Sequence, residues 1–181
     1  CAVIVNDMAE LNVDKDLIDQ SAILQSDTVI AMQNGCVCCT LSDDLANQII
    51  SLAQQDKYDY MIIEASGISE PSQIAQLFDD CQDDHDHAEH GDNVLLSDVA
   101  FIDNCATVVS AAEFFENFED VTRKEGNWSK LMVEQIEYAN VVILNKIDLC
   151  NEEQLTKIEN HLALFNPTAT ILRARNSVID V

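Results

Sequence analysis

Short runs of apolar residues recur along the chain, separated by stretches with helical periodicity. Such runs, bounded by polar or turn-forming residues, are typical of buried strands. They predict about six strands, at residues 2–5, 28–32, 60–63, 105–109, 141–144 and 169–172. Strands that alternate with helices predict an α/β fold with a parallel sheet.

The intervening stretches carry helical signals. Thr40 is placed to cap a helix, and Pro71 suits the first turn of another. Further helices are predicted at 130–139 and 152–164. The first helix has an apolar face with helical spacing, formed by Leu41, Leu45, Ile49 and Leu52.

Three polar clusters directly follow predicted strands, at residues 6–10, 64–71 and 145–148. Parallel sheets bind ligands at the carboxyl ends of their strands. The pattern therefore predicts that the fold brings all three clusters to one edge of the sheet.

Residues 79–97 interrupt this rhythm and are interpreted as an exposed insertion. Its first part, 79–92, reads DDCQDDHDHAEHGD and has no core-forming periodicity. Imidazoles at His85, His87 and His90 suit zinc or nickel. The alternative is a solvated, charged loop with no ligand.

The chain begins with CAVIV, which has the pattern of the middle of a buried strand. We therefore expect residues 1–181 to be a fragment of one domain that lacks its natural N-terminus.

The balance of 9 Lys+Arg against 33 Asp+Glu gives a net charge of −24. That charge argues against nucleic acid or an anionic membrane as a partner. Seven cysteines without a secretion signal fit a reducing cytoplasm.

The motif Asn145-Lys146-Ile147-Asp148 follows an apolar strand. Guanine presents two N–H donors on one edge, and the Asp148 carboxylate can accept both. Asn145 can bond the opposite edge, and the Lys146 stem can cover the ring. The alternative is a polar turn between a strand and a helix.

Glu64 and Gly67 follow another strand. A carboxylate there can hold a magnesium-bound water or orient an attacking water. Gly67 would let a backbone N–H approach a γ-phosphate. An ordinary loop is the alternative interpretation.

Three thiols crowd together at Cys36, Cys38 and Cys39. Thiolates select zinc or Cu(I), and three of them leave a fourth coordination position open. That arrangement suits an ion that must be handed on. A redox pair or a structural cluster remains the alternative.

Together these motifs resemble the CobW-type family of metal-chaperone GTPases, which are P-loop proteins related to the hydrogenase and urease nickel-insertion GTPases. The resemblance spans residues 1 to about 175. The matching motifs are NDMAE at 6–10 with Asp14, GCVCCTL at 35–41, Glu64 with Gly67, Glu70 with Pro71, and NKID at 145–148.

The resemblance implies a parallel-sheet, P-loop GTPase-like three-layer sandwich, truncated at the N-terminus. It implies GTP hydrolysis with Mg²⁺, with Glu64 and Gly67 as catalytic residues and GDP as product. The implied cargo is Zn²⁺, alternatively Co²⁺ or Ni²⁺, held by the three cysteines with Glu10 as a helper. Hydrolysis would release the ion to a client metalloprotein in the cytoplasm, and a second copy of the chain is a candidate partner.

The chain departs from the family pattern in the motif that binds the phosphates of the nucleotide. No Gly-x-x-x-x-Gly-Lys-Ser/Thr motif occurs in the 181 residues. We therefore expect these residues alone not to hydrolyse GTP, whereas the full-length parent does. Two alternatives stay open: a metal-buffering module without nucleotide hydrolysis, or a cobalt or nickel chaperone for cobalamin or hydrogenase-type clients.

Overall fold

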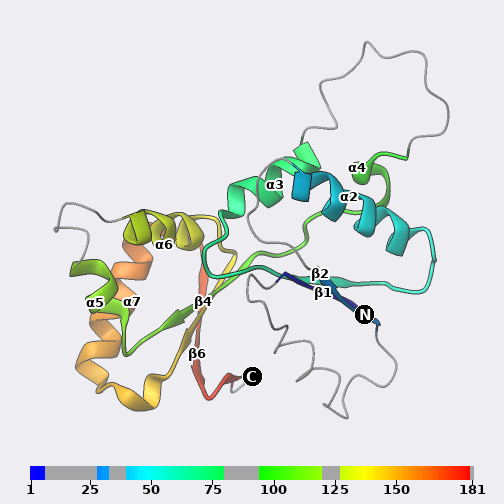
Figure 1. The fold of residues 1–181 in the computed structure, drawn as a ribbon. Coiled ribbons are helices and arrows are strands. Elements are labelled where there is room, and N and C mark those ends of the chain that lie inside the picture. The colour runs from blue at the N-terminus through cyan, green and yellow to red at the C-terminus, as the bar shows by residue number, and fades with distance from the viewer. Residues whose placement is uncertain (7–27, 33–39, 80–93, 120–126, 180–181) are drawn as a thin grey trace. The chain divides into compact units, whose positions relative to one another are not determined.

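The computed structural model describes residues 1–6, 28–32, 40–79, 94–119 and 127–179. The chain divides into two compact units, Cys1–Phe101 and Ile102–Val181. Each unit combines a sheet with helices (Figure 1). None of the helices in these described ranges combines the length and hydropathy needed to cross a membrane.

The first unit is built on a sheet of three parallel strands in the order β2-β1-β3. In register, Ile4 of the central strand pairs with Ile30 on one side and Ile63 on the other. The strands are β1 (Ala2–Asn6), β2 (Thr28–Met32) and β3 (Met61–Glu64). The helices are α2 (Thr40–Ala53), α3 (Pro71–Asp79) and α4 (Leu96–Val99).

The core of the first unit forms where β1 meets these helices. Ala2 and Ile4 are fully buried, and Leu96 of α4 joins the same cluster. The apolar face predicted for the first helix is confirmed by the burial of three of its members, namely Leu45, Ile49 and Leu52.

The second unit has a sheet in the order β4-β5-β6-β7, in which the first three strands are parallel. The last strand pairs antiparallel with β6. The strands are β4 (Ala106–Ser110), β5 (Val141–Asn145), β6 (Thr170–Arg175) and β7 (Val178–Ile179). The helices are α5 (Phe114–Glu119), α6 (Asn127–Glu137), α7 (Glu152–Phe165) and the 3₁₀ helix η4 (Ile147–Leu149).

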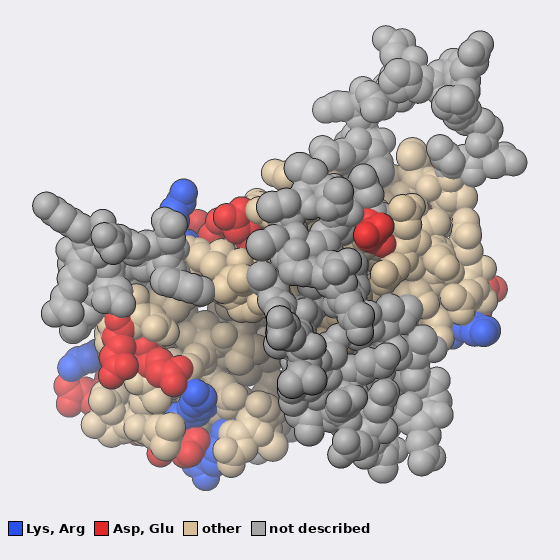
Figure 2. Space-filling model, viewed as in Figure 1, with Lys and Arg blue, Asp and Glu red and all other residues tan. Residues whose placement is uncertain are grey.

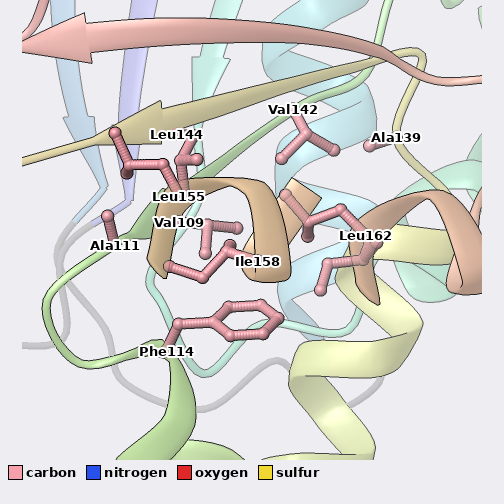
Figure 3. Close-up of a cluster of buried hydrophobic side chains, with 10 residues drawn as sticks. Val109, Ala111, Phe114, Ala139, Val142, Leu144, Leu155, Ile158 and Leu162 are labelled. Atoms are coloured by element: carbon pink, nitrogen blue, oxygen red, sulfur yellow. The ribbon is translucent and has the colours of Figure 1, made fainter. Parts of the chain in front are cut away.

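A continuous apolar core joins β4 and β5 to the helices of the second unit (Figure 3). Val142 and Leu144 of β5 lie against α7, which contributes Leu155, Ile158 and Leu162. The Phe114 ring of α5 lies beside Ile158 and is 1% exposed. This core fixes the ends of β4 and β5, where polar residues follow.

Asn166, which follows the last residue of α7, is a buried polar residue that hydrogen-bonds to several segments of the second unit. Its Nδ2 donates to the carbonyl oxygens of Ile136 at 2.9 Å and Ala139 at 2.8 Å. Its Oδ1 accepts from the backbone N–H groups of Thr168 and Ala169, both at 3.1 Å. One side chain therefore ties the end of α6 to the segment that leads into β6.

Ion pairs between charged side chains connect α7 to β6 at the surface of the second unit. The Arg173 guanidinium donates to both carboxylate oxygens of Glu159, at 2.7 and 3.1 Å, and to Glu152 at 2.9 Å. These carboxylates raise the pKa of Arg173 above its ordinary value, Glu159 most strongly. Figure 2 shows acidic and basic side chains side by side where Figure 1 draws α7.

The predicted α/β fold with parallel strands is confirmed, and the strands are distributed over two sheets, one in each unit. Only one face of β5 is deeply buried, since Val141 and Ile143 are half-buried and Val108 of the neighbouring β4 is 64% exposed. Within the expected insertion at 79–97, Asp79 ends α3 and Leu96 is buried in α4.

Candidate functional site

The candidate site lies at the carboxyl edge of the second unit's sheet. Ser110 ends β4 and Asn145 ends β5, and the two residues are partners in register. The chain after β4 bends back toward β5, because the N–H of Ala111 donates to the Asn145 carbonyl at 2.9 Å. The predicted motif thus begins at the last residue of a strand in which Val142 and Leu144 are buried.

The Asn145 side chain is oriented by the hairpin between β6 and β7. Its Nδ2 donates to Ser177 Oγ at 3.2 Å, and its Oδ1 accepts from the Ser177 N–H at 3.1 Å. Asn176 and Ser177 have φ of 49° and 61°, as the two central residues of a type I′ turn require. The hairpin therefore fixes the plane of the Asn145 amide.

Lys146 adopts a left-handed backbone conformation, with φ 60° and ψ 33°. Its ammonium lies 3.2 Å from the Glu113 carboxylate, which comes from the segment between β4 and α5. The hydrogen bond from Lys146 is the main cause that lowers the pKa of Glu113 below its ordinary value of 4.5. The Ser110 hydroxyl is the second cause, although its buried Oγ makes no hydrogen bond of regular geometry.

Asp148 lies in η4 and its side chain is exposed. The turn is closed by backbone hydrogen bonds from Leu149 to Lys146 and from Cys150 to Ile147, both at 3.1 Å. Ile147 packs against the core on the inner side of the turn. The anchored Ile147 thus leaves the next residue at the surface, where a carboxylate can accept two parallel N–H donors.

Glu64 and Gly67 belong to the first unit. Glu64 is the last residue of β3, and its side chain is exposed. Gly67 is exposed and has no positive φ, and an added Cβ would meet nothing within 4 Å. A turn in which the N–H of Ser69 donates to the Ser66 carbonyl at 2.8 Å follows, and then α3 begins at Pro71 as predicted.

The predicted site residues are divided between the two units. The structure places Glu64 with Gly67 in one unit and Asn145 with Lys146 and Asp148 in the other. The shared edge for the three polar clusters stays a prediction. The remaining candidates lie outside the described residues: Glu10, Cys36, Cys38, Cys39, His85, His87 and His90. Within the described ranges, no group of three or more His, Cys, Asp or Glu residues could hold a metal ion.

Two residues at the site were missed by the sequence interpretation. Ser177 carried a local signal, since Asn-Ser between two short apolar runs is compatible with a two-residue hairpin turn. Glu113 carried none, because its partner Lys146 is 33 residues away and an exposed acid before a helix is unremarkable in a sequence with 33 acids.

The sequence of this α/β chain matches a known family of nucleotide-binding domains. The chain belongs to the CobW/HypB/UreG family, whose nucleotide-binding domain matches residues 1–173. This confirms the family predicted from the motifs.

Individual relatives narrow the comparison. The chain is 36% identical to the zinc-regulated GTPase metalloprotein activator 1 of Dictyostelium discoideum, covering 99% of the chain and 41% of the relative. It is 26% identical to the zinc chaperone YjiA of Escherichia coli, covering 99% of the chain and 50% of that protein. The chain thus spans about half or less of the length of these relatives.

Solved structures support the fold. A zinc-bound triple mutant of the YjiA GTPase matches with a TM-score of 0.62 and 20% identity, over 99% of the chain and 50% of that protein. The zinc-bound YjiA GTPase from E. coli matches with a TM-score of 0.59 and 15% identity, over 94% and 55%. At these identities the likeness concerns the fold alone.

Proposed function

We propose that this chain is the guanine-nucleotide-binding part of a GTP-dependent zinc metallochaperone. The observation that carries the proposal is the NKID motif at the carboxyl end of β5, with Asn145 and Lys146 held by side chains from elsewhere in the unit and Asp148 exposed. Membership of the family and the names of the relatives support it.

Asp148 is assigned the selection of the base. Its carboxylate accepts the two adjacent N–H donors of guanine, each in a charge-assisted hydrogen bond. Adenine lacks that pair of donors and would leave the carboxylate without partners, so the site rejects it. Asn145 bonds the opposite edge of the ring, and the Lys146 stem covers one face.

Glu64 and Gly67 are assigned to the phosphate end. An exposed carboxylate at the end of a parallel strand offers the oxygen donors that Mg²⁺ prefers, directly or through a water. Bound Mg²⁺ would neutralise charge on the phosphates. Gly67 has open space around its Cα, which lets its backbone approach a γ-phosphate without a steric conflict.

The metal cargo is assigned to Cys36, Cys38 and Cys39, with Glu10 as helper and the three histidines of the insertion as collectors. Support comes from the thiolate chemistry and from relatives named as zinc chaperones. Hydrolysis in the intact protein would release the ion to a client metalloprotein. Without a Walker-type phosphate motif, the 181 residues alone would not turn over GTP.

Asp148→Asn tests the proposal in the intact protein that contains this chain. Xanthine carries a carbonyl where guanine carries an amino group, and an amide can donate to that carbonyl. We expect GDP affinity to fall by about 100-fold or more and the affinity for xanthosine diphosphate to rise. Binding is measured by isothermal titration calorimetry.

Asp103→Asn is the matched control, since Asp103 is also an exposed acid of the second unit. It is expected to leave both affinities unchanged. An Asp148→Asn protein that keeps its preference for GDP over the xanthine nucleotide would contradict the proposed function.

A further inference from the structure

Glu113 is an exposed acid in a short segment that is anchored by Ala111 before it and by Phe114 after it. Ala111 is buried, and its N–H donates to the Asn145 carbonyl at 2.9 Å. Phe114, the next residue, is buried in the core under α7 (Figure 3). The backbone that carries Glu113 is therefore held against the motif and against the core at once.

The partner of Glu113 is equally constrained. Lys146 has the left-handed φ of 60° that places it at the turn between β5 and η4. Its Nζ donates to Glu113 Oε1 at 3.2 Å, across 33 residues of sequence. A flexible lysine stem is thus fixed at both ends, by its backbone and by its ammonium.

The ion pair is too exposed to serve mainly the stability of the fold. The Lys146 and Glu113 side chains are 46% and 53% exposed. Exposed pairs of this kind contribute little to folding, because water competes and two long side chains lose rotamer freedom. Fixing a lysine stem before a ligand arrives has a separate effect, since less conformational entropy is lost on binding.

We infer that Glu113 is a positioning residue for the guanine base, acting through Lys146. It holds the ammonium to one side so that the aliphatic stem lies where a base bonded to Asp148 would stack. The inference rests on the proposed function and adds a residue outside the NKID motif to the base site. The hydrogen bond from Lys146 is also the main cause that lowers the pKa of Glu113.

Glu113→Gln in the intact protein tests the inference by equilibrium binding of GDP and of guanosine. The amide keeps the size of the side chain and removes the charge. We expect both affinities to fall by roughly two- to fivefold, the range that an exposed ion pair supports. The preference for guanine over adenine should not change, since Asp148 sets it.

A double-mutant cycle shows whether Glu113 acts through Lys146. Lys146→Met keeps an apolar stem and removes the ammonium, so Glu113→Gln should cause no further loss in that background. The matched control is Glu153→Gln, which removes another exposed ion pair, with Lys157 at 2.7 Å, on α7. It should leave nucleotide affinity unchanged and alter thermal unfolding as little as Glu113→Gln does.

The inference is overturned if Glu113→Gln leaves both affinities unchanged, or if it weakens them equally with and without the Lys146 ammonium. Failure of the proposed function has a different signature. In that case Asp148→Asn would leave the guanine preference intact, whatever Glu113→Gln does.

Discussion

The polar loops after β3 and β5 follow strands of similar length but are held in different ways. In the loop after β5, side chains from distant parts of the chain contact the motif, with Ser177 bonded to Asn145 and Glu113 to Lys146. The loop after β3 contains hydrogen bonds over short spans of sequence, from the Ser69 N–H to the Ser66 carbonyl and from the Gln73 side chain to the Glu70 carboxylate.

Under the proposed function, this difference would suit the two ends of a nucleotide. A base keeps the same shape throughout a cycle, so a site braced before binding loses less conformational entropy. A γ-phosphate is present in only one state, and a loop with local turns can change its arrangement without disturbing the core. The predictions below test this contrast, in order of decreasing effect.

Asn166→Ala should have the largest effect, because this buried side chain bonds the end of α6 to the segment before β6 in the unit that carries the loop after β5. The substitution removes the Asn166 donor from the buried carbonyls of Ile136 and Ala139, and the Ile136 carbonyl keeps only the 3.2 Å hydrogen bond from the Ala139 N–H among the bonds described. We expect a loss of about 3 kcal/mol in the free energy of unfolding, measured by urea denaturation. Asn160→Ala, on the exposed side of α7, is the control and should change stability little. A loss of similar size in both variants would show that the Asn166 contacts do not stabilise the unit.

Gly67→Ala, in the loop after β3, should lower the rate of GTP hydrolysis while leaving the free energy of unfolding nearly unchanged. An added Cβ meets nothing within 4 Å, so unfolding should change by less than about 0.5 kcal/mol. The methyl group would face the phosphate, and GTP hydrolysis by the intact protein should fall at least about tenfold. Ser66→Ala, which adds no carbon, is the control in the same phosphate-release assay. Normal hydrolysis by Gly67→Ala would remove Gly67 from the phosphate site.

Acidification should give the smallest effect, on the Glu113–Lys146 pair. The folded-state pKa of Glu113 lies below 4.5, so its stabilising contribution is present above that pH and is lost as the pH falls through the lowered value. A ¹³C NMR titration of the Glu113 carboxyl should show the low midpoint, and Lys146→Met should raise it. The Glu153 midpoint, lowered by Lys157, should not respond to Lys146→Met. An unchanged Glu113 midpoint would mean that Lys146 is not its main partner.

Much of the fold could be predicted because its signals are local. Pro71 begins α3 as expected, since its fixed φ suits a first turn. Glu152 begins α7 as expected, and the structure adds the reason: Asn151 and Gln154 form a reciprocal capping box with two hydrogen bonds of 2.9 Å. The strand predicted at 60–63 runs from Met61 to Glu64 in the structure, one residue later.

The site could be predicted only in part, because it depends on contacts between segments that are far apart in the sequence. The NKID motif is contiguous, so its residues were found, but the groups that orient them come from other elements. The short β7 and its turn depend on pairing with β6, and an apolar pair of residues is too brief to signal a strand. The distribution of strands over two sheets likewise depends on pairing between segments far apart in sequence.

The Asn166 carboxamide also has a consequence for how the second unit opens. The end of α6, the exit from α7 and the start of β6 all meet at this one side chain. None of these three segments can fray alone without exposing the same buried group, so they should open as one cooperative unit. The amide protons of Thr168 and Ala169, although they lie in a loop, should therefore exchange with solvent deuterium as slowly as those in the middle of β5.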